Sequence, residues 1–452
     1  MTNDMTKGNP LKLIIMFTIP VLIGNIFQNF YNIVDSIIVG QFLGVDALAA
    51  VGTTGSINFL VIGWVSGMTS GFAILIAQSF GAGDHKRLRH YVAMSIYLCA
   101  AMAAVMTAGL LIANEPVLRL MNTPDNIFED TRSYIAIIYA GLPVTIMYNM
   151  LAGTARSLGD SKTPLYFLIL SSLLNIGLDL LFVAVLPLGV AGAAYATVLA
   201  QGVSAVLCFF YVRRHFEILH FSREDARFNG RSAWRLMVMG IPMALQFSIT
   251  GLGTMIVQAS LNLLGSAYIA AFAAAIKVQN IIVQVFPSLG VTMATFAGQN
   301  AGAGKIKRIR KGMRQAFFIV LGGSVVCALI VYFLGDSMVT MFVKDPTGEI
   351  RSIARQMFRI SMWFYPFLGT IFLFRNVLQG LGDGFVPMLG GVFELFARWL
   401  AIVLLAAPLG YVGICLTDPC AWVSALIPLI PVYFVRMKRL MRWEQEKMVA
   451  AE

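Results

Sequence analysis

The chain has 452 residues, of which 58% are hydrophobic and 12% charged, and its formal net charge is +11 at pH 7. An average soluble protein carries roughly 25% charged residues, so this composition excludes a soluble globular protein and a disordered one. The excess of Lys and Arg does not indicate a nucleic-acid partner, because these residues lie in short segments between apolar runs.

Apolar runs of about 20 residues, each enough to cross roughly 30 Å of hydrocarbon, recur from Leu11 to Val435. Backbone groups find no water in lipid, so each run should be helical. The sequence therefore predicts an all-α polytopic membrane protein with twelve transmembrane helices. These helices are expected near 11–39, 47–77, 91–113, 133–155, 164–186, 190–212, 236–263, 268–299, 315–335, 356–378, 387–407 and 411–435.

The connections between these runs predict the orientation of the chain. Most Lys and Arg outside the spans lie at the two termini and in the segments near 78–90, 156–163, 213–235 and 300–314. By the positive-inside rule both termini are then cytoplasmic, as expected of a multi-pass protein of the cell membrane. The opposite set of connections holds Arg119, Arg132, Lys344, Arg351 and Arg355.

The sequence offers no motif for catalysis or for a cofactor. The connections are too short for a soluble catalytic domain, and the histidines (His85, His90, His215 and His220) lie in the predicted cytoplasmic basic segments without a His-Glu-x-x-His pattern. A glycine-rich turn near Lys305 fails the P-loop pattern, because Ile306 follows where Ser or Thr is needed. We therefore expect neither an enzyme nor a bound cofactor.

An internal repeat is the most informative feature of the sequence. Gln78-x-x-Gly-Ala-Gly-x-x-Lys-Arg-x-Arg89 recurs as Gln299-x-x-Gly-Ala-Gly-x-x-Lys-Arg-x-Arg310, Pro187-Leu-Gly-x-x-Gly192 as Pro408-Leu-Gly-x-x-Gly413, Leu158-Gly-Asp-x-x-x-Pro164 as Leu381-Gly-Asp-x-x-x-Pro387, and Pro20 and Pro143 match Pro242 and Pro366. Six spans in each half give both halves the same orientation, so they should be related by a pseudo-two-fold axis along the membrane normal. The predicted domains are an N-terminal six-helix lobe (1–212), a basic cytoplasmic linker (213–235) and a C-terminal six-helix lobe with a cytoplasmic tail (236–452).

The chain resembles the multidrug and toxic compound extrusion (MATE) transporters in four features. These are the run from Asn25 to Gly40 (NIFQNFYNIVDSIIVG), the paired Gln-x-x-Gly-Ala-Gly segments, the Leu-Gly-Asp turns and the two six-span halves. The resemblance covers essentially the whole chain. It implies two six-helix lobes and export of drugs or toxic compounds against inward flow of H⁺ or Na⁺.

Two buried acids are the strongest functional candidates, because an ionisable residue inside the membrane costs roughly 2.5–3.5 kcal/mol on insertion scales. Asp35 shares a helix face with Gln28 and Asn32, and Asn175 shares one with Asp179. These carboxylates, the amides and the hydroxyl of Thr197 would suit either a proton or Na⁺. Pro20 removes a backbone hydrogen bond upstream, so we expect it to act as a hinge for the first span.

The resemblance implies roles for particular residues. Asp35, Asn175, Asp179 and Thr197 match the positions of a cation network in the N-terminal lobe of one branch of the family. That branch also uses a tyrosine in the fourth span, for which Tyr134 and Tyr139 are both available, and the sequence does not choose between them.

The second half does not reproduce this acidic cluster. What it offers instead is Lys277, Glu394, Arg398 and Asp418. Glu394 and Arg398 are four residues apart and are interpreted mainly as a mutually neutralised pair. Lys277 could pair with Asp418. The candidates for the lining of a central cavity are Gln28, Asn32, Tyr139, Lys277, Glu394, Arg398 and Asp418.

The leading hypothesis is a secondary active efflux antiporter that exports small amphipathic or cationic organic compounds in exchange for H⁺ or Na⁺. We expect it to work as a monomer surrounded by membrane lipids. The alternative hypothesis is a flippase or exporter of a lipid-linked or peptidic molecule. It predicts a strongly basic cavity, whereas the inner charges of this chain are mixed.

Overall fold

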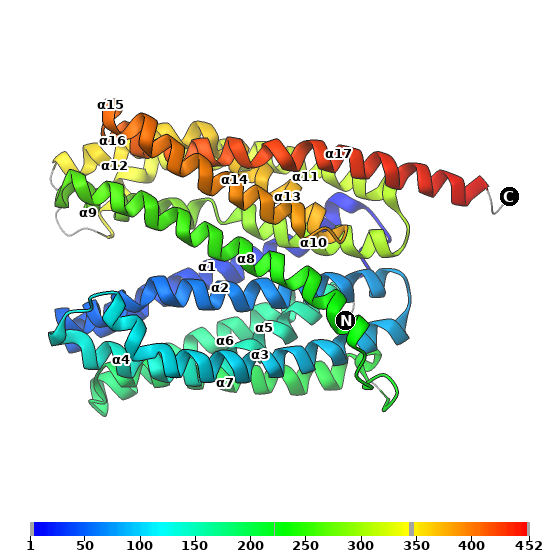
Figure 1. Ribbon diagram of the computed structural model, residues 1–452, viewed down its shortest axis with the longest axis horizontal. Coiled ribbons are helices and arrows are strands. Elements are labelled where there is room, and N and C mark those ends of the chain that lie inside the picture. Colours follow the sequence, from blue (N-terminus) through cyan, green and yellow to red (C-terminus); the bar gives the residue numbers. More distant parts are fainter. Residues whose placement is uncertain (1–3, 221, 343–347, 450–452) are drawn as a thin grey trace. The chain divides into compact units, whose positions relative to one another are not determined.

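A computed structural model describes residues 4–220, 222–342 and 348–449, and these residues contain helices and no strand. Ten helices among them are long and apolar enough to cross a membrane, and two bent helix pairs bring the possible spans to twelve. The predicted fold class, an all-α polytopic membrane protein, is confirmed. Figure 1 shows the order of the elements along the chain.

The first half of the chain is built from seven α-helices and one π-helical segment. Their bounds are α1 Pro10–Leu43, α2 Val45–Gly81, α3 His85–Leu120, α4 Asp125–Ala140, α5 Leu142–Ser157, α6 Lys162–Asp179, the π-helix η1 Leu180–Val185, and α7 Gly189–His215.

The second half repeats this order with more interruptions. After the short helix η2 (Glu217–Leu219), its elements are α8 Gly230–Leu261, η3 Asn262–Leu264, α9 Ser266–Ile282, α10 Val285–Gly302, α11 Ile306–Val339, α12 Gly348–Ser361, η4 Met362–Phe364, α13 Tyr365–Gly380, α14 Phe385–Ala401, the π-helix η5 Ile402–Ala406, α15 Ala407–Leu409, α16 Tyr411–Cys415 and α17 Thr417–Val449.

The fourth and eighth predicted spans are each bent rather than continuous. The bend is 46° between α4 and α5 and 41° between α9 and α10. At the first bend, Pro143 occupies the opening turn of α5, where its missing N–H costs little. A Cβ atom on Gly141 would lie 2.5 Å from a methyl group of Val198, so a larger residue at this bend would collide with α7.

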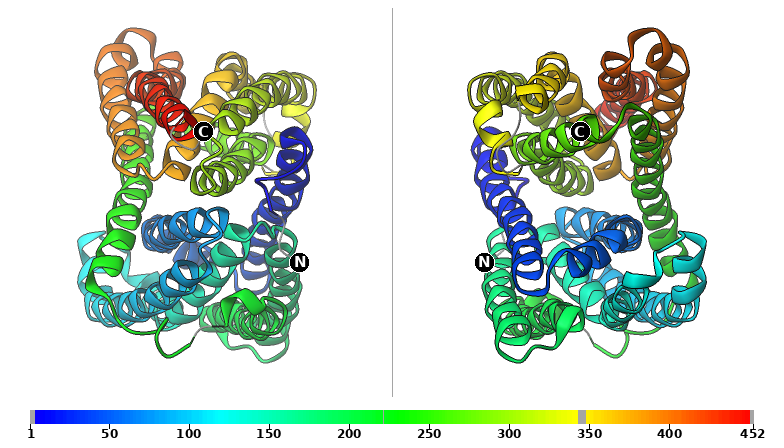
Figure 2. Two further views of the ribbon diagram at one scale, coloured as in Figure 1. Left: turned by 90° about the vertical axis from the view of Figure 1, so that its right-hand side faces the viewer. Right: turned by 90° about the vertical axis from the view of Figure 1, so that its left-hand side faces the viewer.

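The chain forms two compact units. Unit 1 contains Ile23–Ala244, and unit 2 contains Met5–Leu22 together with the described residues from Leu245 onward. The units therefore divide inside α1 and α8, close to Pro20 and Pro242, and not at the basic segment 213–235. Figure 2 shows the helices of each unit end-on, packed side by side.

Close helix contact explains why the first part of α8 belongs to unit 1. A Cβ atom on Gly67 of α2 would lie 2.5 Å from the Cα of Ala244, and one on Gly71 would lie 2.5 Å from the Cα of Gly240. Two backbones can approach this closely only where side chains are absent, as in other small-residue contacts between membrane helices.

The segment 213–235, expected to be a linker, also packs within unit 1. The Nε atom of Arg89 donates to Oδ2 of Asp225 across 2.8 Å, and Nδ1 of His90 lies 3.0 Å from the carbonyl oxygen of Asp225. The first copy of the repeated basic motif therefore holds the segment that precedes α8.

The second copy of the motif holds the segment that precedes α1. In unit 2, Met5 N donates to Oε1 of Gln299 (2.9 Å), and Lys305 Nζ donates to the carbonyl of Thr6 (2.9 Å). Arg308 donates to the carbonyls of Met5, Lys7 and Gly8 at distances of 2.7–3.3 Å. We call residues 5–8 with their partners Gln299, Lys305 and Arg308 the N-terminal clasp.

The tight turn within each motif depends on glycine. Gly83 and Gly304 both have φ +70°, in the left-handed region that residues with a side chain rarely adopt. The repeated Gly-Ala-Gly sequence is thus a helix-to-helix turn with a basic rim.

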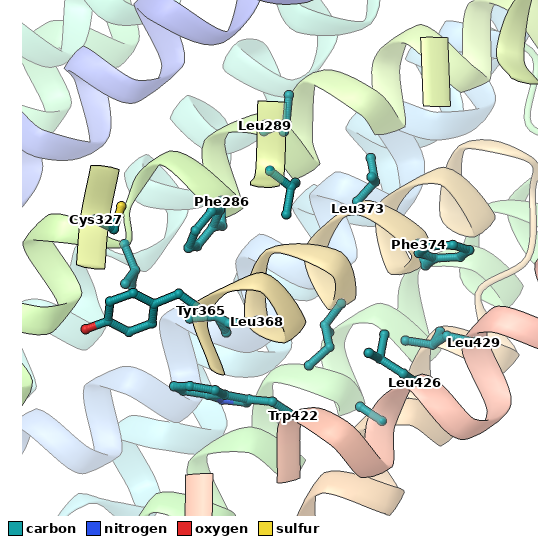
Figure 3. Packing of buried hydrophobic residues seen from close by; sticks show 14 of the residues in the cluster. Phe286, Leu289, Cys327, Tyr365, Leu368, Leu373, Phe374, Trp422, Leu426 and Leu429 are labelled. Atoms are coloured by element: carbon teal, nitrogen blue, oxygen red, sulfur yellow. The ribbon is translucent and has the colours of Figure 1, made fainter. Parts of the chain in front are cut away.

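The core of unit 2 is apolar and continuous. Figure 3 shows Phe286 and Leu289 of α10 beside Tyr365 of α13, with Trp422 and Leu429 of α17 on the other side of α13. A separate buried cluster in unit 1 includes residues of α2, α3, α4 and α5. Each unit therefore has its own packed interior on which polar sites are built.

Candidate functional site

Two acids from different helices meet inside unit 1. Asp35 lies in the C-terminal half of α1, and Asp179 is the last residue of α6 and is fully buried. Their carboxyl groups are close enough to interact directly. Oδ1 of Asp35 and both oxygens of Asp179 accept no hydrogen bond from any residue that the structure describes.

Two tyrosines surround this acid pair. Tyr31, one turn before Asp35, and Tyr134 of α4 both lie within electrostatic reach of the two carboxyl groups. Tyr139 instead belongs to the apolar core formed with α2 and α5. The reason is helix geometry, since five residues correspond to a rotation of about 140°, which turns the two tyrosines to different faces of α4. Of the two predicted alternatives, only Tyr134 lies beside the acids.

Asn175 and Thr197 extend the polar cluster. The amide of Asn175, which is 2% exposed, donates through Nδ2 to Oγ1 of Thr197 across 3.4 Å. Its Oδ1 atom is buried and accepts no hydrogen bond from the described part of the chain. Because Asn175 precedes Asp179 by one helical turn, this free oxygen lies on the same face of α6 as the acid.

Gln28 and Asn32, which the sequence placed on the same face as Asp35, do not join this cluster. Both side chains are exposed and make no hydrogen bond with any residue that the structure describes. Tyr31 was missed, although it lies one turn before Asp35 and its spacing alone would have suggested it.

The helix that carries Asp179 changes its winding immediately afterwards. The π-helix η1 runs from Leu180 to Val185, and the N–H of the next residue, Leu186, donates to the carbonyl of Leu181 across 2.8 Å. The equivalent η5 follows Ala401 in the second half. Single π-helical turns are frequent at functional sites because they displace side chains from regular helical positions.

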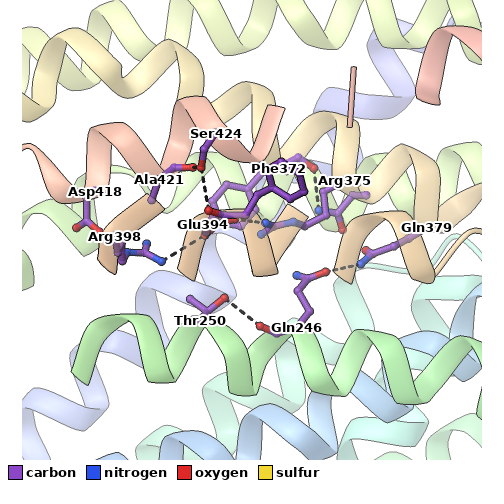
Figure 4. Close-up of polar contacts among 12 residues, drawn as sticks. Gln246, Thr250, Phe372, Arg375, Gln379, Glu394, Arg398, Asp418, Ala421 and Ser424 are labelled. Carbon is purple, nitrogen blue, oxygen red and sulfur yellow. Dashed lines mark hydrogen bonds and ion pairs between the residues drawn. The ribbon is translucent and has the colours of Figure 1, made fainter. Parts of the chain in front are cut away.

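A second polar cluster lies in unit 2 and joins three helices (Figure 4). Glu394 of α14 forms ion pairs with Arg375 of α13 and with Arg398, whose Nη1 lies 3.6 Å from Oε2 of Glu394. Arg398 also donates through Nε to Oδ1 of Asp418 on α17 at 2.9 Å. Two guanidinium and two carboxylate groups thus balance in charge.

The polar cluster of unit 2 contradicts one expected ion pair and includes one residue that the sequence analysis did not name. Lys277 does not pair with Asp418; its side chain is exposed and its Nζ lies 5.7 Å from the ring centre of Phe342. Asp418 pairs with Arg398 because both lie where α14 packs along α17. Arg375 was missed, although an arginine within an apolar span is itself a signal of a buried polar site.

An amide pair borders the same cluster. Nε2 of Gln379 donates to Oε1 of Gln246 across 3.0 Å, and the Oγ1 of Thr250 donates to the carbonyl of Gln246 at the same distance. A Cβ on Gly253 would lie 2.8 Å from Nη1 of Arg398, so α8 passes directly against that guanidinium group.

The donor sets do not describe a transition-metal centre. No group of three or more His, Cys, Asp or Glu side chains converges within residues 4–220, 222–342 and 348–449. The acid pair of unit 1 offers oxygen atoms only, which suits a proton or a hard cation such as Na⁺.

Comparisons with known proteins agree on one family. The MatE family profile matches residues 20–181 and 242–404. The chain is 29% identical to the probable multidrug resistance protein YpnP of Bacillus subtilis, over 91% of this chain and 92% of that protein, and 27% identical to the probable multidrug resistance protein YoeA of the same organism, over 97% and 96%. The fold is similar to the outward-facing structure of a multidrug resistance MATE family transporter, with a TM-score of 0.91, 21% identity, and coverage of 97% of this chain and 99% of that one.

Proposed function

Because the chain belongs to the MatE family of membrane transporters, we propose that it is a secondary active efflux antiporter in which Asp35 and Asp179 bind the coupling ion. Its cargo would be amphipathic, often cationic, organic compounds, in keeping with relatives named as multidrug resistance proteins. The coupling ion is H⁺ or Na⁺. The protein works as a monomer in the cell membrane with both termini in the cytoplasm.

The observation that carries this proposal is the unsatisfied acid pair. Ionised carboxylates only accept hydrogen bonds, so two of them facing each other inside the membrane repel and remain unpartnered. One proton shared between Asp35 and Asp179, or one Na⁺ between their oxygens, would satisfy both. The pair is therefore more stable when occupied.

The surrounding oxygens allow either ion. For Na⁺, the free Oδ1 of Asn175 would add a neutral ligand beside the carboxylates. For H⁺, the hydroxyl groups of Tyr31 and Tyr134 would donate to the carboxylate that remains ionised. The two cases differ in which gradient drives transport.

Asp35 stands where an ion from outside would reach it. It lies about 38 Å along α1 from Pro10, at 1.5 Å per residue, so it is well past the middle of the span. Pro20 lies between, near the point where α1 passes from unit 2 to unit 1. Ion binding at Asp35 would shift the outer half of α1 about this proline, and the state that releases cargo outward would be favoured.

The test is gradient-driven transport in proteoliposomes. Uptake of a fluorescent organic cation is measured with an H⁺ gradient and a Na⁺ gradient imposed separately, for the wild type, D35N and D179N. Both variants should keep their folded elution profile and lose about tenfold or more of the driven flux. D46N is the matched control, because Asp46 is an exposed acid at the start of α2. Normal driven flux in D35N would overturn the mechanism.

A further inference from the structure

A surface cavity of about 210 Å³ lies between α11 and α12 of unit 2. It is lined by Tyr332 and Asp336 of α11 and by Arg355, Phe358 and Arg359 of α12, with Val331 and Met362. We propose that this cavity binds the phosphate group of a bilayer phospholipid. The proposal does not depend on the transport mechanism.

Helix lengths place the cavity at a membrane surface. Counted from Gln315, where the expected span begins, Tyr332 lies about 26 Å and Asp336 about 32 Å along α11. Arg359 lies about 32 Å from Gly380 along the span formed by α12 and α13. Since the hydrocarbon layer is roughly 30 Å thick, both estimates put the cavity at headgroup level, on the face opposite the basic turns.

The charges of the cavity favour an anion. Asp336 is already occupied, because Nε of Arg355 donates to its Oδ2 across 2.9 Å. Arg359, one helical turn after Arg355, is exposed and forms no ion pair with any residue that the structure describes. One uncompensated guanidinium group therefore faces the cavity, and its planar fork matches the oxygens of a phosphate diester.

One exposed aromatic residue in the cavity lining, Tyr332, and two that follow lining residues in the sequence favour a lipid over a free phosphate ion. The exposed fractions of Tyr332, Phe333 and Trp363 are 59%, 69% and 73%. Aromatic side chains concentrate at the headgroup level of membranes, where an apolar ring and a polar group both find partners. Acyl chains would lie along these rings, while the phosphate group meets Arg359.

Close packing of α11 against α12 builds the wall of the cavity. A Cβ on Gly335 would lie 3.0 Å from the ring of Phe358, so this glycine lets α11 and α12 approach closely. Phe358, which lines the cavity, is 3% exposed.

The experiment compares R359Q with R351Q in delipidated, detergent-purified protein. Arg351 is exposed on the same helix, two turns away, and does not line the cavity. Binding of dioctanoyl phosphatidylglycerol, dioctanoylglycerol and inorganic phosphate is measured by native mass spectrometry. We expect R359Q to weaken phosphatidylglycerol binding about tenfold, corresponding to one good charge-assisted contact, and R351Q to change it less than about twofold.

Three results would overturn the proposal. They are undiminished phosphatidylglycerol binding by R359Q, an equal loss in R351Q, and binding of inorganic phosphate or dioctanoylglycerol as tight as that of phosphatidylglycerol. R359K serves as a second variant, and it should bind with intermediate affinity because lysine keeps the charge but loses the bidentate geometry.

Discussion

Arg398 and Asp418 form the ion pair at one end of a row of four charged residues inside unit 2, with Nε of Arg398 2.9 Å from Oδ1 of Asp418. Glu394 pairs with both Arg398 and Arg375, so residues of alternating charge join α13, α14 and α17. Removing one residue of a buried ion pair leaves the charge of the other residue uncompensated, whereas removing both residues of the pair does not.

We therefore predict that E394Q lowers the stability of the purified protein by about 3–5 kcal/mol, because two buried arginines are left with one acid. The double variant E394Q/R375Q should recover part of this loss, since one arginine and one aspartate still balance. Thermal unfolding in detergent measures both. D336N is the comparison at an exposed ion pair and should cost at most about 1 kcal/mol. Equal losses for E394Q and D336N would contradict the buried network.

The contact between α2 and α8 predicts opposite effects for two glycines of one helix. In G71A the new methyl group would meet the backbone of Gly240, which cannot rotate away, and the expected cost is about 2 kcal/mol. In G55A the new methyl group meets nothing within 4 Å, so the higher helix propensity of alanine should leave stability equal or improve it by up to about 1 kcal/mol. Similar thermal shifts for the two variants would argue against the close crossing.

The N-terminal clasp predicts a local change that proteolysis can detect. In R308Q the carbonyls of Met5, Lys7 and Gly8 lose a common donor, so the segment should detach more often. Trypsin cleavage after Lys7 should then become about tenfold faster, as expected for the loss of roughly 1.4 kcal/mol of local stability. R310Q changes an exposed arginine of the same motif and should leave the rate near that of the wild type. Unchanged cleavage in R308Q would show that the clasp does not depend on this arginine.

A pH dependence follows from Asp225 in the segment before α8. The backbone N–H of Ser222 and the side chain of Arg89 donate to its carboxylate, and these bonds lower the pKa of Asp225. A lowered pKa in the folded state means that the stabilisation is complete above the unfolded pKa of about 3.9 and is lost as pH falls through the folded value.

D225N should therefore be less stable than the wild type at pH 7. The difference between the two melting temperatures should shrink progressively below about pH 4, where the wild-type carboxylate becomes protonated. Melting curves across this range measure the effect. A difference that stays constant with pH would assign the loss to packing and not to the charge.

Much of the fold follows from local patterns in the sequence. Apolar runs of membrane length predicted the spans, because every span must satisfy its own backbone in lipid. The repeated turns predicted equivalent elements in both halves, and Gly83 and Gly304 indeed adopt the same left-handed conformation. The high cost of an acid in the membrane singled out Asp35 and Asp179 without any knowledge of their contacts.

The sequence by itself determined the helical membrane class, the repeat and the short list of buried acids, because hydrophobic length, turn chemistry and burial cost are local properties. Only the tertiary structure decided that Asp35 faces Asp179, that Tyr134 and not Tyr139 lies beside them, and that Asp418 meets Arg398 and not Lys277. It also decided that α1 and α8 are each shared between the units. These outcomes depend on which helix faces pack together, and that is set by contacts between residues far apart in the chain.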